Sequence, residues 1–202
     1  MKISNKDDIS ISDSELWELF REGNLIAFEL IYKDYFDKLY NYGLQFIKDE
    51  TLVEDVIQDL FIDLKRRCNH LSQTDTILPY LYSAFRRKMI RARDKANKFQ
   101  ELEENSLSFQ IDISIEDQLI DEEGKGQQKK SLANAMNQLS EKHREIIFLY
   151  YYENMSYEEI KEIQGFDNVK SARNLLYKAV QSLRTVFKFV SFLLLIKLIE
   201  IV

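Results

Sequence analysis

The sequence predicts an all-α protein: two small helical domains joined by an acidic linker, with a helix-turn-helix as the C-terminal domain. Its 202 residues include five Gly and one Pro, so helices can run with few interruptions. Apolar residues recur at helical spacing in several long segments. Between these segments, residues 101–123 hold nine acidic residues and no basic one. A like-charged stretch of this kind is typical of a linker between folded units.

Three segments have the spacing of a capping box. In this arrangement a Ser or Thr side chain caps the start of a helix, and a Glu three residues later caps it in return. The three segments are Ser12–Glu15, Thr51–Glu54 and Ser156–Glu159. We therefore expect a helix to begin at each of these positions.

The first domain is predicted over residues 1–100. Apolar residues over 27–47 form a helical stripe that we expect to be buried. The helix that opens at Thr51–Glu54 is expected to reach about residue 67, and a polar loop follows it. Pro79 suits the first position of the next helix, because its fixed φ and missing N–H are tolerated there. That helix is expected to run to about residue 99, with a basic second half.

The second domain is predicted over residues 129–188, after a linker over 101–128. A short helix opens at Ser156, Gly165 follows where a left-handed residue would sit, and a long helix runs from Val169 to Lys188. This is the order of a helix-turn-helix. The apolar tail, residues 189–202, is too short and too often charged to span a bilayer. We expect it to be covered by the protein itself or by a partner.

The charges are segregated, although the formal net charge is −6. Residues 86–98 hold seven basic residues and one acidic residue, and residues 169–188 hold five basic residues and no acidic one. Two basic patches on an acidic body indicate nucleic-acid binding. On the long C-terminal helix, the candidates for contacts to base edges and phosphates are Lys170, Ser171, Arg173, Asn174 and Lys178. The alternative is an ordinary solvated face of a helical bundle.

The sequence indicates no catalytic site. It has one Cys and two His, and it lacks a Gly-rich phosphate loop or a nucleophile elbow. Cys68 and His70 have no further soft ligands near them in the sequence, so neither a metal site nor a cofactor is expected. We therefore expect a protein that is not an enzyme, in a reducing, cytoplasmic compartment.

Two sets of motifs resemble the RNA polymerase sigma-70 superfamily. The second conserved region of that family is similar to residues 54–61 (EDVIQDLF) and 79–88 (PYLYSAFRRK). Its fourth region is similar to residues 139–147 (LSEKHREII), 154–160 (NMSYEEI) and 169–178 (VKSARNLLYK). A chain with only these two regions around an acidic linker resembles the extracytoplasmic-function (ECF) sigma factors. The turn at residues 165–168 is one residue longer than the family pattern.

This resemblance implies a sigma factor that directs promoter recognition, DNA melting and transcription initiation. It implies core-polymerase contacts at Asp55, Gln58, Asp59 and Ile62. It also implies that the first domain holds promoter DNA, for which the phosphate candidates are Arg86, Arg87, Arg91 and Arg93. The implied partners are core RNA polymerase, promoter DNA and an anti-sigma factor, which can be membrane-bound. The acidic linker is expected to enter the basic channels of the polymerase, or else to be a soluble tether.

Two other functions remain open on the sequence alone. One is a helix-turn-helix regulator that binds duplex DNA without polymerase, and the other is a helical protein-interaction adaptor. Residues 49–67 discriminate between these functions and a sigma factor, because a simple regulator has no need of the exposed face with Asp55, Gln58 and Asp59.

Overall fold

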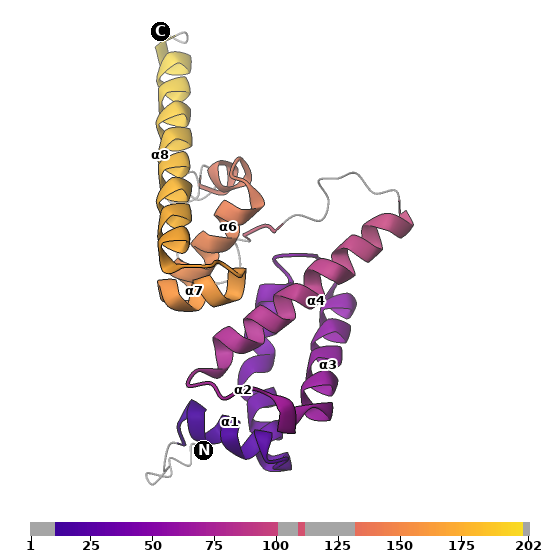
Figure 1. Ribbon diagram of the computed structural model, residues 1–202. Coiled ribbons are helices and arrows are strands. Elements are labelled where there is room, and N and C mark those ends of the chain that lie inside the picture. Colours follow the sequence, from indigo (N-terminus) through magenta and orange to yellow (C-terminus); the bar gives the residue numbers. More distant parts are fainter. Residues whose placement is uncertain (1–10, 101–108, 112–131, 200–202) are drawn as a thin grey trace, which may run out of the picture.

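The computed structural model describes residues 11–100, 109–111 and 132–199 (Figure 1). Within these ranges the chain forms helices and no strand, which confirms the all-α prediction. The first domain consists of α1 (Asp13–Arg21), α2 (Leu25–Gly43), α3 (Glu50–Arg66), the short 3₁₀ helix η1 (Cys68–His70) and α4 (Ile77–Gln100). In the second domain residues 132–137 are helical, and α6 (Glu141–Ile147), the π-helix η2 (Phe148–Tyr152), α7 (Tyr157–Gln164) and α8 (Val169–Ile199) follow.

Two of the three predicted capping boxes are present. Ser12 accepts from the N–H of Glu15 while the Glu15 carboxylate accepts from the N–H of Ser12, and Ser156 and Glu159 do the same. The third prediction is wrong, because α3 begins before Thr51. Asp49 is its cap and accepts from the N–H of Leu52 at 3.1 Å. A carboxylate is at least as good a cap as a Thr hydroxyl, so the acid that comes first in the chain opens the helix.

The predicted start of α4 at Pro79 is also wrong. The helix begins at Ile77, whose N–H donates to the Asp13 carboxylate at 2.9 Å. Pro79 is then the third residue of the first turn, where a backbone N–H has no partner within the helix. The same Asp13 carboxylate accepts from the Tyr35 hydroxyl at 2.9 Å, so one side chain joins α1, α2 and the start of α4.

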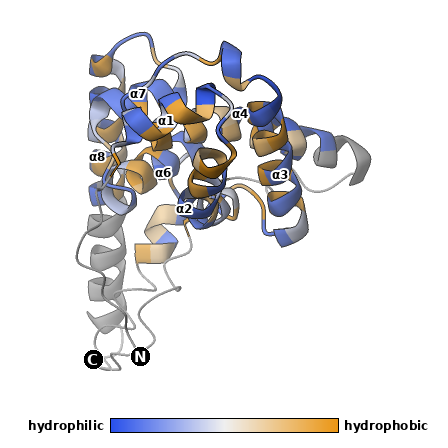
Figure 2. Cartoon of the chain, turned by 90° about the horizontal axis from the view of Figure 1, so that it is seen from below, coloured by the Kyte–Doolittle hydropathy of each residue, from blue (hydrophilic) through white to orange (hydrophobic). Residues whose placement is uncertain are grey.

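The first domain is packed around aromatic rings and one close helix crossing. Trp17 is fully buried, and its indole N–H donates to the Ser72 carbonyl at 2.9 Å. At Gly43, a methyl group would lie 2.6 Å from Val53 Cγ1 and 3.0 Å from Phe85 Cζ. Glycine therefore allows α2 to approach α3 and α4 closely. Figure 2 shows that apolar and hydrophilic residues are interspersed along these helices.

The second domain has the predicted helix-turn-helix. Gly165 ends α7 in the left-handed conformation, with φ 70° and ψ 40°. The turn over residues 165–168 leads to α8, and the Asn168 side chain accepts from the N–H of Ser171 at 3.0 Å. Both α6 and α7 pack on α8. On the side of α8 that faces α6 and α7, Ala172, Leu176 and Ala179 are buried.

The two domains are in contact. Helix α4 packs on α7 (Figure 1), and Phe109 and Ile111 are buried in the same hydrophobic cluster as residues of both domains. The rest of the predicted linker, and residues 200–202 of the apolar tail, lie outside the described residues. Helix α8 continues into the tail as far as Ile199. None of the described helices is long and apolar enough to cross a membrane.

Candidate nucleic-acid interface

The residues implied for polymerase binding lie together on the surface of α3. Asp55, Gln58 and Asp59 are exposed, and Ile62 is 62% exposed although the opposite side of the helix is buried core. A helix face that combines acidic residues with an exposed apolar one suits a basic partner, because charge guides the approach and burial holds the complex. The structure therefore places these four residues on one accessible face.

Lys88 of α4 lies beside this face. Its ammonium group is 2.5 Å from both the Asp59 and the Asp63 carboxylates. Burial lowers the pKa of Lys88, but the two acceptors outweigh it and raise that pKa. In the sequence Lys88 belongs to the basic stretch 86–98, yet the structure pairs it with acids.

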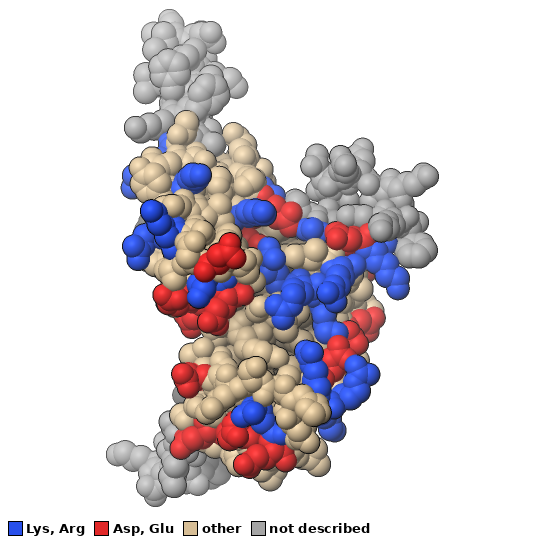
Figure 3. Space-filling view, in the orientation of Figure 1, with Lys and Arg blue, Asp and Glu red and all other residues tan. Residues whose placement is uncertain are grey.

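The four arginines implied for DNA binding in the first domain separate into two pairs. Arg87 and Arg91 are exposed. They line a cleft of about 260 Å³ between α3 and α4, together with Leu60, Asp63, Arg67, Ala84 and Lys88. Sequence analysis missed Arg67, which lies at the C-terminal cap of α3. The signal for it was the dibasic pair Arg66–Arg67 directly before the loop. Figure 3 shows basic side chains gathered on this side of the molecule.

The other two arginines, Arg86 and Arg93, point to the second domain. Arg86 donates from Nε and Nη2 to the two carboxylate oxygens of Glu145, at 2.5 and 2.9 Å. Arg93 is paired with Glu141. Their side chains are 18% and 15% exposed. In this arrangement both guanidinium groups are occupied by carboxylates of α6.

Glu145 is the centre of this contact and is itself 1% exposed. It also accepts from the Tyr42 hydroxyl at 2.7 Å. Burial, and next the charge of Glu145, raise the pKa of Tyr42 well above its ordinary value. Burial lowers the pKa of Arg86, but the hydrogen bonds and charge of Glu145 outweigh it and raise that pKa. Tyr42 and Arg86 thus supply the donors that a buried carboxylate needs.

The recognition-helix candidates lie on the outer side of α8. Lys170, Arg173, Asn174 and Lys178 are exposed. Ser171 is half-buried, and its hydroxyl donates to the Asn168 side chain at 3.1 Å, which fixes the first turn of the helix. The structure therefore places all five candidates at the start of α8, as the sequence predicted.

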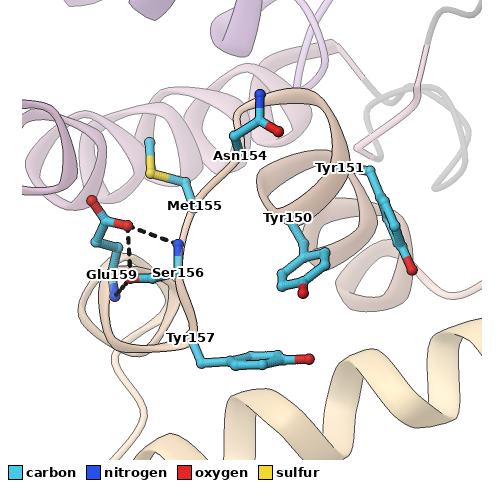
Figure 4. Close-up of a pocket in the computed structure, with 7 residues that line it drawn as sticks. All are labelled: Tyr150, Tyr151, Asn154, Met155, Ser156, Tyr157 and Glu159. Atoms are coloured by element: carbon cyan, nitrogen blue, oxygen red, sulfur yellow. Dashed lines mark hydrogen bonds between the residues drawn. The ribbon is translucent and has the colours of Figure 1, made fainter.

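Arg173 has a further neighbour that the sequence did not indicate. Its guanidinium carbon lies 5.3 Å from the centre of the Tyr157 ring, close enough for a cation–π contact. Tyr157 also lines an open pocket of about 510 Å³ between η2 and α7, with Tyr150, Tyr151, Asn154, Met155, Ser156 and Glu159 (Figure 4). The aromatic wall of this pocket thus borders the predicted DNA-reading surface.

The chain is similar to proteins of known function. A family model described as "Sigma-70, region 4" matches residues 129–183. The ECF RNA polymerase sigma factor SigM of Bacillus subtilis (strain 168) is 24% identical over 159 residues, which cover 78% of this chain and 93% of SigM. The RNA polymerase sigma factor SigV of the same organism is 22% identical over 151 residues, covering 75% of this chain and 85% of SigV.

Two solved structures have the same fold. CnrH, in complex with the cytosolic domain of CnrY, superposes on this chain with a TM-score of 0.60 at 19% identity. The superposition covers 87% of this chain and 97% of CnrH. The sigma factor RpoE of Bartonella quintana, in complex with the anti-sigma factor NepR, has a TM-score of 0.58 at 17% identity. This superposition covers 80% of this chain and 96% of RpoE.

Proposed function

The chain is an RNA polymerase sigma factor of the ECF type, within the sigma-70 superfamily, and from this we propose how its surfaces share the work of initiation. The face of α3 with Asp55, Gln58, Asp59 and Ile62 binds core RNA polymerase. The start of α8 reads the upstream promoter element. The basic side of α4 holds the DNA strand that is opened, and Arg67 joins Arg87 and Arg91 there as a phosphate contact.

One observation carries the polymerase contact: Ile62 is 62% exposed on the same face of α3 as Asp55, Gln58 and Asp59, while the opposite side of the helix is buried. A regulator that binds DNA alone gains nothing from an exposed isoleucine at this position. A protein that docks on a large partner can bury it there.

The other partners follow from the relatives. Of the two solved structures with this fold, CnrH is in complex with the cytosolic domain of CnrY, and the sigma factor RpoE is in complex with the anti-sigma factor NepR. We propose that this chain is likewise held by an anti-sigma factor. A protein that works on core polymerase and promoter DNA acts in the cytoplasm, and the proposed activity is binding without catalysis of its own.

Pull-down of core polymerase tests the α3 face. Asp55→Arg and Ile62→Glu should each weaken core binding, because the first reverses a steering charge and the second charges an apolar contact. The expected loss is about tenfold or more, or about 1.4 kcal/mol. Glu22→Arg, an equal charge reversal outside this face, is the matched control and should bind like the original chain. Normal core binding by both folded α3 variants would refute the assignment.

A further inference from the structure

Arg173 is exposed at the start of α8 and rests on an aromatic ring, that of Tyr157, whose centre lies 5.3 Å from its guanidinium carbon. Among the described residues no carboxylate pairs with Arg173, whereas Arg86 and Arg93 are each held by an acid of α6. Contact with a ring involves the charge and the flat face of a guanidinium group, so the N–H donors along its edge stay available. The ring can therefore restrain Arg173 without occupying the donors that would meet a base.

The Tyr157 ring is itself held in place. Tyr157 is the first residue of α7, and the capping box of Ser156 and Glu159 fixes the backbone there. The ring of Tyr150 stacks on it, with the centroids 5.1 Å apart and the planes at 28°. In Figure 4 the Tyr157 ring lies between Tyr150 and the neighbouring helix α8. Tyr157 thus offers Arg173 a support that is fixed at its backbone and at its ring.

The turn between η2 and α7 brings the two tyrosine rings together. Met155 is buried, and its N–H donates to the Leu149 carbonyl at 3.0 Å. Asn154 has a positive φ of 54°, a left-handed conformation that is uncommon for a residue other than glycine. Such a conformation costs free energy and persists only when the contacts around it hold it in place. The turn therefore fixes the position of Tyr150 relative to Tyr157.

A restrained arginine is better prepared to read a base than a free one. A long exposed side chain loses conformational entropy when a partner fixes it, and this loss opposes binding. A side chain that is already restrained loses less. Arginine reads guanine by aiming two edge donors at O6 and N7, so the direction of the guanidinium plane matters. A ring beside Arg173 can set that direction before DNA arrives.

We propose that Tyr157 is a positioning residue for promoter recognition: it holds the guanidinium group of Arg173 so that its edge donors reach a guanine of the upstream promoter element. Tyr150 supports the Tyr157 ring. The inference rests on the proposed function, since it assumes that the start of α8 reads the promoter. Because Tyr157 acts through Arg173, its effect is confined to the promoter position that Arg173 reads. The effect disappears when Arg173 is removed.

The mobility of the Arg173 side chain tests the restraint without DNA. NMR relaxation of the arginine Nε–Hε groups in the free chain measures it, and Arg173→Ala identifies the signal. Arg173 should move less than Arg184, an exposed arginine further along α8. Tyr157→Leu should raise its mobility to that of Arg184, whereas Tyr157→Phe, which keeps the ring, should not. Equal mobility of Arg173 in the parent chain and in Tyr157→Leu would overturn the inference.

A double-mutant cycle tests the effect on promoter reading. Promoter duplexes that differ at the position read by Arg173 compete for the chain bound to core polymerase. Tyr157→Leu should reduce discrimination there about fivefold, a size typical of a cation–π contact, and Tyr157→Phe should keep most of it. In the Arg173→Ala background, Tyr157→Leu should change nothing further. Tyr151→Leu, the same substitution at a tyrosine that is 58% exposed in the same pocket, is the matched control and should discriminate like the parent.

The outcomes separate this inference from the proposed function. If Arg173→Ala loses discrimination and Tyr157→Leu does not, the inference fails and the proposed function stands. If Tyr157→Leu has the same effect with and without Arg173, Tyr157 acts through the fold of the helix-turn-helix, and the inference fails. If the parent chain with core polymerase does not discriminate between promoters, the proposed function fails, and the positioning role fails with it. A loss at one position that depends on Arg173 supports both.

Discussion

Tyr42 links the stability of the protein to alkaline pH. Burial raises the pKa of Tyr42, and burial followed by the charge of Glu153 raises that of Tyr82. A raised pKa means that the folded state keeps a proton which the unfolded state releases near pH 10. The stabilisation is thus complete below about pH 10 and is lost as the pH rises above it.

Urea unfolding at pH 8 and pH 11 measures this loss. The parent chain should lose stability between the two values, and Tyr42→Phe should lose less, because phenylalanine has no proton to release. Tyr177→Phe changes a ring that is 64% exposed and should behave like the parent. Equal losses in the parent and in Tyr42→Phe would contradict the role given to the buried hydroxyl.

Arg173 is predicted to read a base in the upstream promoter element. Arg173→Ala should cost roughly 1–3 kcal/mol at one promoter position and leave the other positions unchanged. Binding selection over a promoter library, with the chain bound to core polymerase, measures this. Arg184→Ala, an exposed arginine further along α8, is the matched control. A uniform loss over all sequences would instead make Arg173 a phosphate contact.

At the scale of elements, Gly43 is a position where helix packing leaves no room for a side chain. Because a methyl group there would lie 2.6 Å from Val53 Cγ1, Gly43→Ala should force α2 away from α3 and destabilise the fold by about 1–3 kcal/mol. The midpoint of urea unfolding checks this. Ala84→Gly, which removes a methyl group from the buried side of α4, should cost less, about 1 kcal/mol. An unchanged midpoint for Gly43→Ala would show that the helices have room to move.

The elements themselves could be predicted because their signals are local. Capping residues and apolar spacing act within one or two turns, so the helix-turn-helix and the exposed row on α3 followed from the sequence. Errors arose where a distant group competed with the local signal. The start of α4 depends on Asp13, which lies 64 residues earlier and accepts from its first N–H. The π-helix η2 has no local signature in FLYYY.

The candidate site was predicted only in part, for the same reason. Residue types placed Arg86, Arg87, Arg91 and Arg93 in one basic group. The difference between them comes from Glu145, 59 residues after Arg86, and from Glu141. A sequence pattern on one helix cannot show which of its basic side chains will meet an acid on another domain. Phe109 lies inside an acidic stretch, and no sequence pattern indicated that it would be buried.

At the scale of the whole molecule, the interface joins both domains into one hydrophobic cluster. We therefore expect one cooperative thermal transition, since neither domain can unfold without exposing the apolar surface of the other. Differential scanning calorimetry measures this as equal calorimetric and van't Hoff enthalpies. Phe109→Asp should split the transition in two by placing a charge at the buried junction. Two transitions in the parent chain would show that the domains unfold independently.

The buried cluster of Glu145, Arg86 and Tyr42 limits which amino-acid substitutions can occur at these positions during evolution. Loss of either charged member alone leaves an unpaired buried charge, at a cost of about 3–5 kcal/mol, whereas replacement of both by apolar residues can be almost neutral. A descendant that exchanges the pair must therefore pass through an unfit single mutant or acquire two changes together. We therefore expect positions 86 and 145 to change together among descendants, because each constrains the substitutions that the other can accept.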